Sequence, residues 1–254
     1  MLSFQSYVSS QPGPKRAFNE DSYLVSTELG LPKDLLTRCG ILYAVADGMS
    51  GHAAGQVASK LAVTTLKEYY TQPNFNLSPL NRLEALFQNA HEKILATAYR
   101  NAAYKGMGTT LTAVVLKEGW LYYGHVGDSR LYLITGATGR LEQITYDHTL
   151  VARYLREGKL SAQEAEQEDS SILEQALGFT RNVKIDLGQL AIKSGDYIIL
   201  ATDGLTKSVS VSKMKSIVLN SQDAEDICKK LVRKATENGL IDDITVIVIE
   251  VVGD

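Results

Sequence analysis

Acidic residues follow apolar runs at widely separated places in this chain of 254 residues. Asp47 comes directly after "GILYAVA" and Asp203 directly after "YIILAT", and each is followed by glycine. A carboxylate at the end of a rigid strand is well placed to hold a hard cation, because Mg²⁺ and Mn²⁺ prefer oxygen ligands and tolerate little positional error. The two Asp-Gly pairs therefore indicate a divalent metal site.

Three further acidic segments have a similar setting: "NED" at 19–21, "GDSR" at 127–130, and the pair Asp242 and Asp243. Several such acids together can hold two ions, and a glycine after the acid exposes its carbonyl as one more oxygen ligand. For any single Asp-Gly the alternative is a plain turn. Because an unpaired buried charge is costly, we expect a metal ion, or pairing with Arg or Lys, to compensate these acids.

Alternation and spacing predict the elements that position the acids. β-rich segments at 2–9, 21–27 and 40–46 indicate three early strands, and the last of them is nearly continuously apolar, as in a strand covered on both faces. Apolar residues three and four apart predict amphipathic helices over 53–70 and 79–100.

The second half of the chain returns to strands. From Met107 to Thr145, β-rich runs separated by glycine-containing turns predict an antiparallel meander. Residues 149–176 have helical polarity, with a capping-box start at "SAQE". Two strands at 183–190 and 197–201, a helix at 224–236 and a closing strand at 243–252 follow, as the same patterns predict.

The helices are grouped rather than alternating one for one with strands. This order favours sheets covered by helices over a parallel βαβ fold, so the fold class is α+β. We find no internal repeat, low-complexity segment or linker, and we expect residues 1–254 to form one domain.

Composition excludes several classes of partner. The hydrophobic content of 44% with 22% charged residues is typical of a globular domain. The net charge is -3 and no Lys/Arg block occurs, so neither nucleic acid nor a membrane surface is expected as a partner. With no long apolar run and no signal-like start, we expect a cytoplasmic protein. Cys39 and Cys228 lack CxxC spacing, and Cys228 is expected to pack in the core.

Eight motifs carry a resemblance to a known family. They are "GPKRAFNEDS", "VADGMSGH", "GMGTTLTAV", "GHVGDSRLY", "TYDHT", "EQALG", "ILATDGLT" and "DDITVIVI". In order and spacing the chain resembles the metal-dependent protein Ser/Thr phosphatases, the PPM or type 2C family, and most of all its compact bacterial members. The resemblance runs from about Gly13 to Ile249. It implies a four-layer α-β-β-α sandwich, two antiparallel sheets flanked by helix pairs, with a flap subdomain at about 149–176.

The resemblance also implies the metal ligands. Asp47 would bridge two Mn²⁺ or Mg²⁺ ions, and Asp203 and Asp242 would complete the protein ligands of the first ion. The carbonyl of Gly48 would bind the second ion.

Further residues would surround these ions. Glu20 and Asp21 would lie near the second ion, directly or through water. Asp128, with Asp203, matches the positions of a third, weaker ion in bacterial relatives. Arg16 occupies the position that binds phosphate, where its planar fork can hold two oxygens.

Two metal ions lower the pKa of a shared water, so that hydroxide attacks phosphorus in line near neutral pH. The implied function is hydrolysis of phosphoserine and phosphothreonine in proteins, the substrates of a Ser/Thr kinase, by a monomeric enzyme in signalling. The alternatives are a catalytically weak regulator that binds phosphoproteins on the same fold, and a phosphatase for small phosphate esters. Loss of ligand acids would mark the regulator, and all of them are present.

Two positions depart from the family pattern. Asp243 replaces an asparagine and adds negative charge beside the metals, and Met49 stands where many eukaryotic relatives have a candidate general acid, His. His52 is one alternative proton donor, although a structural role is also expected of it. A water positioned by a third ion at Asp128 and Asp203 is another, unless Asp128 only fixes a hairpin by accepting hydrogen bonds from Ser129 or Arg130.

The remaining polar residues have plainer interpretations. Ser50 is interpreted as a turn residue, since no GxSxG elbow is present. We expect His91 and His125 to be packing or surface residues, and His148 to order the start of the flap. The acidic run of the flap, at 164–169, is expected to be a solvated face.

Overall fold

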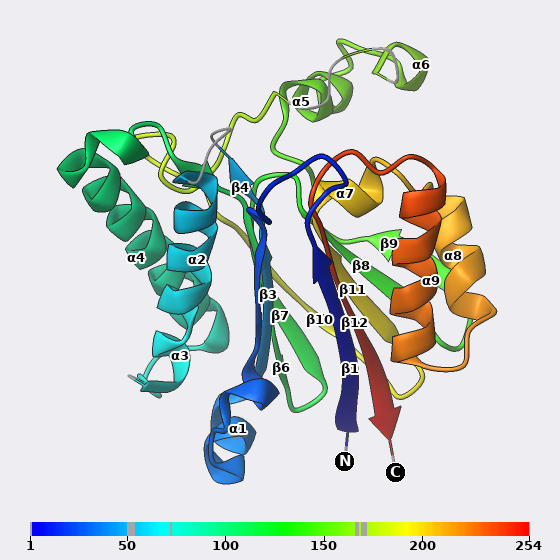
Figure 1. Ribbon diagram of the computed structural model, residues 1–254. Coiled ribbons are helices and arrows are strands. Elements are labelled where there is room, and N and C mark those ends of the chain that lie inside the picture. The colour runs from blue at the N-terminus through cyan, green and yellow to red at the C-terminus, as the bar shows by residue number, and fades with distance from the viewer. Residues whose placement is uncertain (1, 50–53, 72, 166–167, 169–171, 254) are drawn as a thin grey trace.

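The computed structural model describes residues 2–49, 54–71, 73–165, 168 and 172–253. Two five-stranded sheets, antiparallel throughout, face each other in it (Figure 1). The first sheet, in spatial order, is β1 (Leu2–Gln11), β12 (Ile244–Gly253), β11 (Tyr197–Ala201), β8 (Arg130–Thr135) and β9 (Arg140–Gln143). The second is β10 (Asp186–Ala191), β7 (Trp120–Val126), β6 (Leu111–Lys117), β3 (Ile41–Ala46) and β2 (Ser22–Val25).

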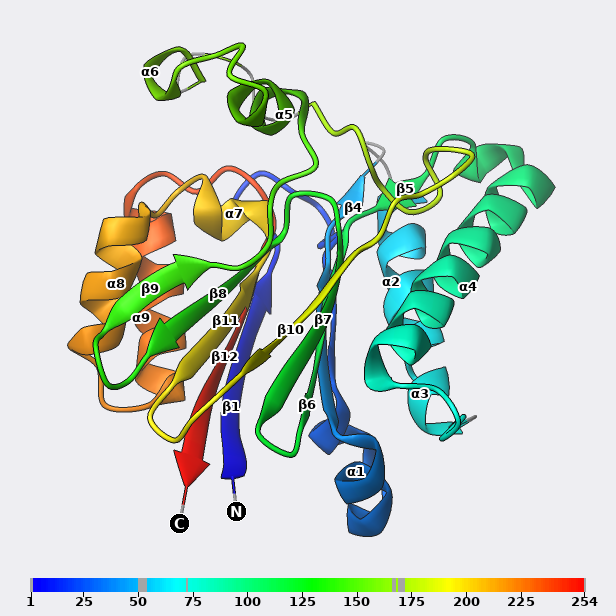
Figure 2. The same ribbon diagram turned by 180° about the vertical axis from the view of Figure 1, so that it is seen from behind.

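A pair of helices covers the outer face of each sheet (Figures 1 and 2). Helices α2 (Ala54–Leu66) and α4 (Pro79–Arg100) pack on the second sheet, and α8 (Val211–Leu219) and α9 (Ala224–Glu237) pack on the first. This arrangement confirms the α+β, four-layer sandwich. The shorter elements are η1 (Ser26–Leu29), α1 (Lys33–Cys39), β4 (Gly48–Met49), α3 (Glu68–Thr71), η2 (Ala102–Tyr104), β5 (Gly108–Thr109), α5 (Leu150–Arg156), α6 (Ala162–Ala165) and α7 (Asp203–Thr206).

The central strands are apolar on both faces because each face meets another layer. In β3, Leu42 and Ala44 belong to the core beneath α2 and α4, whereas Tyr43 and Val45 belong to the core between the sheets. Burial of one large apolar side chain contributes roughly 1.5–3 kcal/mol. The continuous apolar run before Asp47 is therefore the sequence of a doubly covered strand, as predicted.

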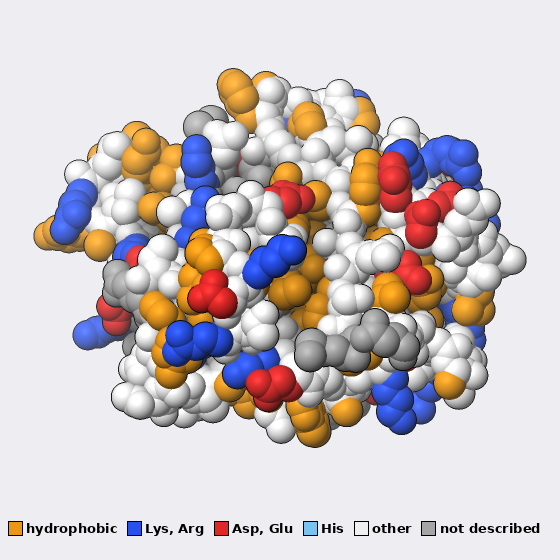
Figure 3. Space-filling view, turned by 90° about the horizontal axis from the view of Figure 1, so that it is seen from below, with side chains coloured by type: hydrophobic (Ala, Val, Ile, Leu, Met, Phe, Trp, Pro, Cys, Tyr) orange, Lys and Arg blue, Asp and Glu red, His pale blue; other side chains and the backbone are white. Residues whose placement is uncertain are grey.

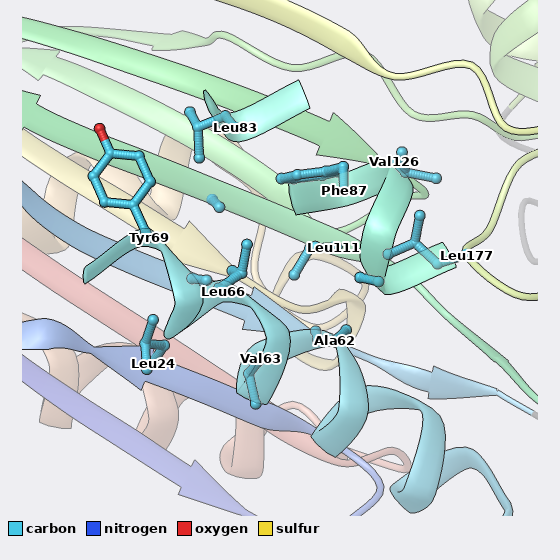
Figure 4. Close-up of a cluster of buried hydrophobic side chains, with 14 of the residues drawn as sticks. Leu24, Ala62, Val63, Leu66, Tyr69, Leu83, Phe87, Leu111, Val126 and Leu177 are labelled. Carbon is cyan, nitrogen blue, oxygen red and sulfur yellow. The ribbon is translucent and has the colours of Figure 1, made fainter. Parts of the chain in front are cut away.

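The core beneath α2 and α4 shows how the helices are fixed on the sheet (Figure 4). Leu66 of α2 and Phe87 of α4 are fully buried with Leu111 of β6 and Val126 of β7. On the other side of the molecule, Cys228 of α9 is buried in the core between α8, α9 and the first sheet, which confirms its packing role.

The predicted meander over 107–145 is wrong in one respect. β6 and β7 lie in the second sheet, whereas β8 and β9 lie in the first. The chain changes sheets at Gly127, which has a φ of 112° that favours glycine, so Asp128 sits in the link between the two layers and not in a hairpin.

Helix boundaries also differ from the expectation. The helix predicted over 53–70 ends as α2 at Leu66, and α3 follows as a separate short helix. Helices α1 and α8 were not predicted, and both are short segments of mixed polarity.

Helices α5 and α6, which belong to the segment 149–176, project from the sandwich (Figure 2). The expected capping box is present, since Glu164 accepts from the Ser161 N–H and its own N–H donates to Ser161 Oγ. At the base of the segment, Arg153 donates to both carboxylate oxygens of Glu174 at 2.9 Å.

The surface seen from the side of the chain termini mixes basic, acidic and apolar side chains (Figure 3). This mixture agrees with the small net charge of the chain. Among the described residues, no helix combines the length and the apolar character that a membrane crossing needs.

Candidate metal centre

The acidic segments meet at the edge of the sandwich that carries β4 and α7, opposite the chain termini (Figure 1). They surround a cavity of about 260 Å³. The structure brings nearly all the predicted site residues together there, and the cavity is lined by Arg16, Glu20, Asp47, Gly48, Met49, Thr110, Asp128, Leu173, Asp203, Lys207 and Asp242. Asp21 is buried beside this group, where its Oδ2 accepts from Thr202 Oγ1 at 2.8 Å.

Asp47 is fixed at the end of β3 by Thr109 and Thr110, which directly precede β6. Its N–H donates to Thr110 Oγ1 at 2.9 Å, and its carbonyl accepts from the Thr110 N–H and from Thr109 Oγ1. Thr110 Oγ1 also pairs with Ser129 Oγ at 2.8 Å. Because Ser129 follows Asp128, this chain of hydrogen bonds joins the two acidic segments.

Asp203 opens the short helix α7 just after β11. Its Oδ2 lies 2.5 Å from Lys207 Nζ, whereas its Oδ1 is buried and has no hydrogen-bond partner among the described residues. Gly204 lets this helix approach β12 closely, since a Cβ there would lie 2.1 Å from the Asp243 carbonyl oxygen. The backbone segments that carry Asp203 and Asp242 therefore lie in close contact.

Asp243 does not line the cavity and faces the backbone. Its Oδ1 accepts from the Gly13 N–H at 2.9 Å and its Oδ2 from the Glu20 N–H at 2.7 Å. The carboxylate that departs from the family pattern thus fastens the loop between β1 and β2 to the start of β12.

Arg16, on that loop, lies between two of the predicted ligands. It donates to Asp242 Oδ1 and, at 3.2 Å, to Glu20 Oε2. Burial alone would lower the pKa of Arg16, but the charges of Asp242, Asp243 and Glu20 raise it. Its guanidinium is held at the cavity wall, in a position to bind a phosphate group in the cavity.

The carboxylates carry more negative charge than the protein compensates. Desolvation and the neighbouring carboxylates raise the pKa of Asp47 well above its usual value. Desolvation likewise raises the pKa of Asp21 to about 8 and that of Asp128 to about 7. Such shifts mean that ionised carboxylates repel one another in a poorly solvated site.

These side chains fit divalent cations. Five carboxylates but only two cationic groups, Arg16 and Lys207, are among the described residues that line the cavity. Asp21 Oδ1 and Asp203 Oδ1 are buried oxygens without hydrogen-bond partners in the described part of the chain, as expected of atoms that hold an ion. Among the described residues, no three His, Cys, Asp or Glu side chains form a metal-ligand group, and Asp203 and Asp242 pair with Lys207 and Arg16.

The histidines have structural partners where they are described. His125 is buried, pairs with Thr112 Oγ1, and has its pKa lowered by desolvation to about 3. His148 Nδ1 accepts from the Gly127 N–H, and its Nε2 lies 3.1 Å from Asp186, so it ties the flap to the sheet link. His91 is buried and accepts from the Gly178 N–H.

Some of the predicted roles lie outside the described residues. His52 and Ser50 are among these, and so are residues 166 and 169 of the acidic run. The described acids of that run, Glu164 and Glu168, are exposed, in agreement with a solvated face.

Sequence reasoning missed three residues of the cavity: Thr110, Leu173 and Lys207. Only Lys207 had a usable signal, because it follows Asp203 by four residues, the spacing at which helical side chains meet. Leu173 reaches the cavity from the flap, about 125 positions after Asp47, and no local pattern predicts that contact.

Comparison with known proteins identifies the family. The model of the protein phosphatase 2C family matches residues 30–243. The chain is 35% identical over 204 residues to protein phosphatase PhpP of Streptococcus pneumoniae, covering 80% of this chain and 82% of that protein.

Two solved structures match this chain over its full length and over the full length of their own chains. The Mycobacterium tuberculosis serine/threonine phosphatase PstP/Ppp superposes with a TM-score of 0.86 at 31% identity. The catalytic domain of PstP in complex with two manganese ions superposes with a TM-score of 0.85 at 32% identity. The chain belongs to the protein phosphatase 2C family and is a protein serine/threonine phosphatase.

Proposed function

We propose that this chain hydrolyses phosphoserine and phosphothreonine in proteins with Mn²⁺ or Mg²⁺ bound at the cavity that Asp47, Asp203 and Asp242 line. The observation that carries the proposal is the convergence of five carboxylates on one cavity with buried, unpartnered oxygens on Asp21 and Asp203. The manganese complex of the similar PstP domain supports the choice of metal.

Two ions would be held in the core of the site. Asp47, Asp203 and Asp242 would supply carboxylate oxygens, Gly48 its carbonyl, and Glu20 and Asp21 oxygens nearby, while Asp128 with Asp203 would hold a third, weaker ion. When bound, such ions supply Lewis-acid chemistry that makes water nucleophilic at neutral pH and neutralises phosphate charge.

The side chains of the protein have their own tasks. Arg16 would bind two phosphate oxygens through its planar fork and align phosphorus over the carboxylates, which requires it to exchange part of its contact with Asp242 for the phosphate. Thr110 would keep Asp47 in place through the hydrogen bonds to its backbone. Leu173 and Met49 would limit water access at the cavity mouth.

The departing serine or threonine oxygen needs a proton. Met49 cannot supply it, and Asp128 lies at the same cavity with its pKa raised to about 7, first of all by desolvation. We therefore assign this step to a water that Asp128 helps to orient.

The wider context of the proposal rests on the sequence. Residues 1–254 would act as a single, monomeric domain whose flap at 149–176 contacts substrate, and the substrates would be those of a Ser/Thr kinase. A cytoplasmic location remains a prediction.

The test is phosphate release from phosphoserine, phosphothreonine and phosphotyrosine peptides, and from a small phosphate ester, with Mn²⁺ or Mg²⁺ and again with chelator. We expect metal-dependent release from the first two peptides and near-complete loss in Asp47→Asn. Turnover that persists in chelator after thorough metal removal would refute the mechanism. Peptide binding without phosphate release would favour a regulator that binds phosphoproteins. Preference for the small ester would favour a phosphatase for small phosphate esters.

A further inference from the structure

Among the described residues that line the cavity, Lys207 is a cation without an assigned role. The residue follows α7, and its N–H donates to the carbonyls of Asp203 and Leu205, which fixes the start of its side chain. Because it lies one helical turn after Asp203, its ammonium returns to that carboxylate and lines the cavity.

The two oxygens of Asp203 are used differently. Oδ2 lies 2.5 Å from Lys207 Nζ, and Oδ1 is buried without a hydrogen-bond partner in the described part of the chain. A cation that uses only Oδ1 leaves the lysine contact intact. A cation shared through Oδ2 must displace the ammonium or accept its repulsion.

Lys207 also interacts electrostatically with Asp128 and Asp47. The positive charge of Lys207 lowers the proton affinity of Asp128, and in return Asp128 and Asp203 favour the ammonium form of Lys207. The side chain of Lys207 is 40% exposed, whereas that of Asp203 is 11% exposed, so the lysine is the more solvent-accessible partner of this ion pair.

We propose that Lys207 is a built-in cation on the Asp128 side of the cavity, which competes with a divalent ion shared by Asp128 and Asp203. This inference rests on the proposed function, since it presupposes that the carboxylates bind metal. The ammonium supplies positive charge there without an ion, and it weakens the third site while leaving the core sites occupied.

The test is a Mn²⁺ binding titration, by calorimetry and equilibrium dialysis, on the unaltered chain and on Lys207→Met. We expect the weakest site to bind at least about fivefold more tightly in Lys207→Met, as for two ligands that exclude each other electrostatically. Lys207→Arg retains the charge and should bind Mn²⁺ as the unaltered chain does. Lys213→Met, an exposed position on α8, removes the same charge away from the cavity and should change nothing.

Asp128→Asn identifies the location of the effect. The tighter site should disappear in the double variant Lys207→Met, Asp128→Asn. In chelator, Lys207→Met should melt roughly 2–4 °C lower than the unaltered chain, because Asp203 loses its partner when no metal is present.

The outcomes separate the two proposals. Two core sites in every variant, with an unchanged weakest site in Lys207→Met, would overturn the role of Lys207 alone. A gain that persists after Asp128→Asn would also overturn it. Absence of Mn²⁺ binding in the unaltered chain would overturn the proposed function, and this inference with it.

Discussion

Asp243 Oδ2 accepts a hydrogen bond from the backbone N–H of Glu20 at 2.7 Å, although 223 residues separate them. The other oxygen of Asp243 accepts from Gly13. The loop that carries Arg16 and Glu20 is thus clamped at both ends by one carboxylate from the start of β12. The Asp243 carboxylate therefore has a structural role, in addition to the negative charge that it adds near the metal centre.

The clamp leads to a prediction for Asp243→Asn. An amide has one oxygen, so one of the two backbone N–H groups must lose its acceptor, at a cost of about 1–3 kcal/mol of stability. We expect a lower melting temperature, while turnover at saturating Mn²⁺ stays within about tenfold, a barrier change of roughly 1.4 kcal/mol or less. Thermal denaturation and phosphopeptide kinetics test this.

Asp242→Asn is the matched comparison for that change. It removes a carboxylate that lines the cavity and should abolish nearly all turnover. A loss as deep in Asp243→Asn, with unchanged stability, would mean that Asp243 is itself a metal ligand.

Local patterns predicted the strands, the helices and the α+β class, whereas the family resemblance implied the four-layer sandwich. The run before Asp47 is apolar throughout and β12 is largely apolar, and the structure shows both strands covered on two faces. The acids at their ends share one edge because the two sheets face each other. Asp47, Asp203 and Asp242 therefore line one cavity, and Asp128 joins them from the link between the sheets.

What the sequence did not predict depends on contacts between distant segments. Nothing near Gly127 marks a change of sheet, because a hairpin turn and a crossing between layers use the same residue types. The acceptors of the Gly13 and Glu20 N–H groups become visible only when the first and last strands pair. Likewise, the pairing of Arg16 with Asp242 joins residues 226 positions apart.

Asp47→Asn should stabilise the metal-free protein while it abolishes turnover. Desolvation and the carboxylates of Asp21, Asp203, Asp128 and Asp242 oppose the ionised form of Asp47, and a neutral amide removes that repulsion. We expect the melting temperature in chelator to rise by roughly 2–4 °C for each kcal/mol relieved. A lower melting temperature of Asp47→Asn in chelator would contradict the proposal that an ionised Asp47 destabilises the metal-free protein.

Stability without metal should fall as the pH rises from about 7 to about 8.5. In this window Asp21, with a pKa of about 8, and Asp128, with a pKa of about 7, still bind protons in the folded state, whereas the unfolded chain does not. Stability falls with pH wherever the folded state binds more protons, here by roughly 1–2 kcal/mol over the window.

Melting temperatures in chelator at the two pH values measure the effect. Asp128→Asn should reduce the fall, and saturating Mn²⁺ should remove it, because the ion favours ionised ligands. His125, whose pKa desolvation lowers to about 3, gives the opposite slope, but only below about pH 6.5, where the unfolded histidine takes up a proton. Stability that rises between pH 7 and 8.5 in chelator would contradict the raised carboxylate pKa values.

Asp128→Ala should impair turnover of phosphopeptides much more than turnover of nitrophenyl phosphate. A nitrophenolate leaves with little protonation, whereas a serine alkoxide needs a proton. The structural alternative, that Asp128 fixes a hairpin through Ser129 or Arg130, finds no support: Arg130 donates to both oxygens of Asp147, and Ser129 Oγ pairs with Thr110. Kinetics on both substrates decide the matter, and equal losses together with a lower melting temperature in chelator would restore the structural role.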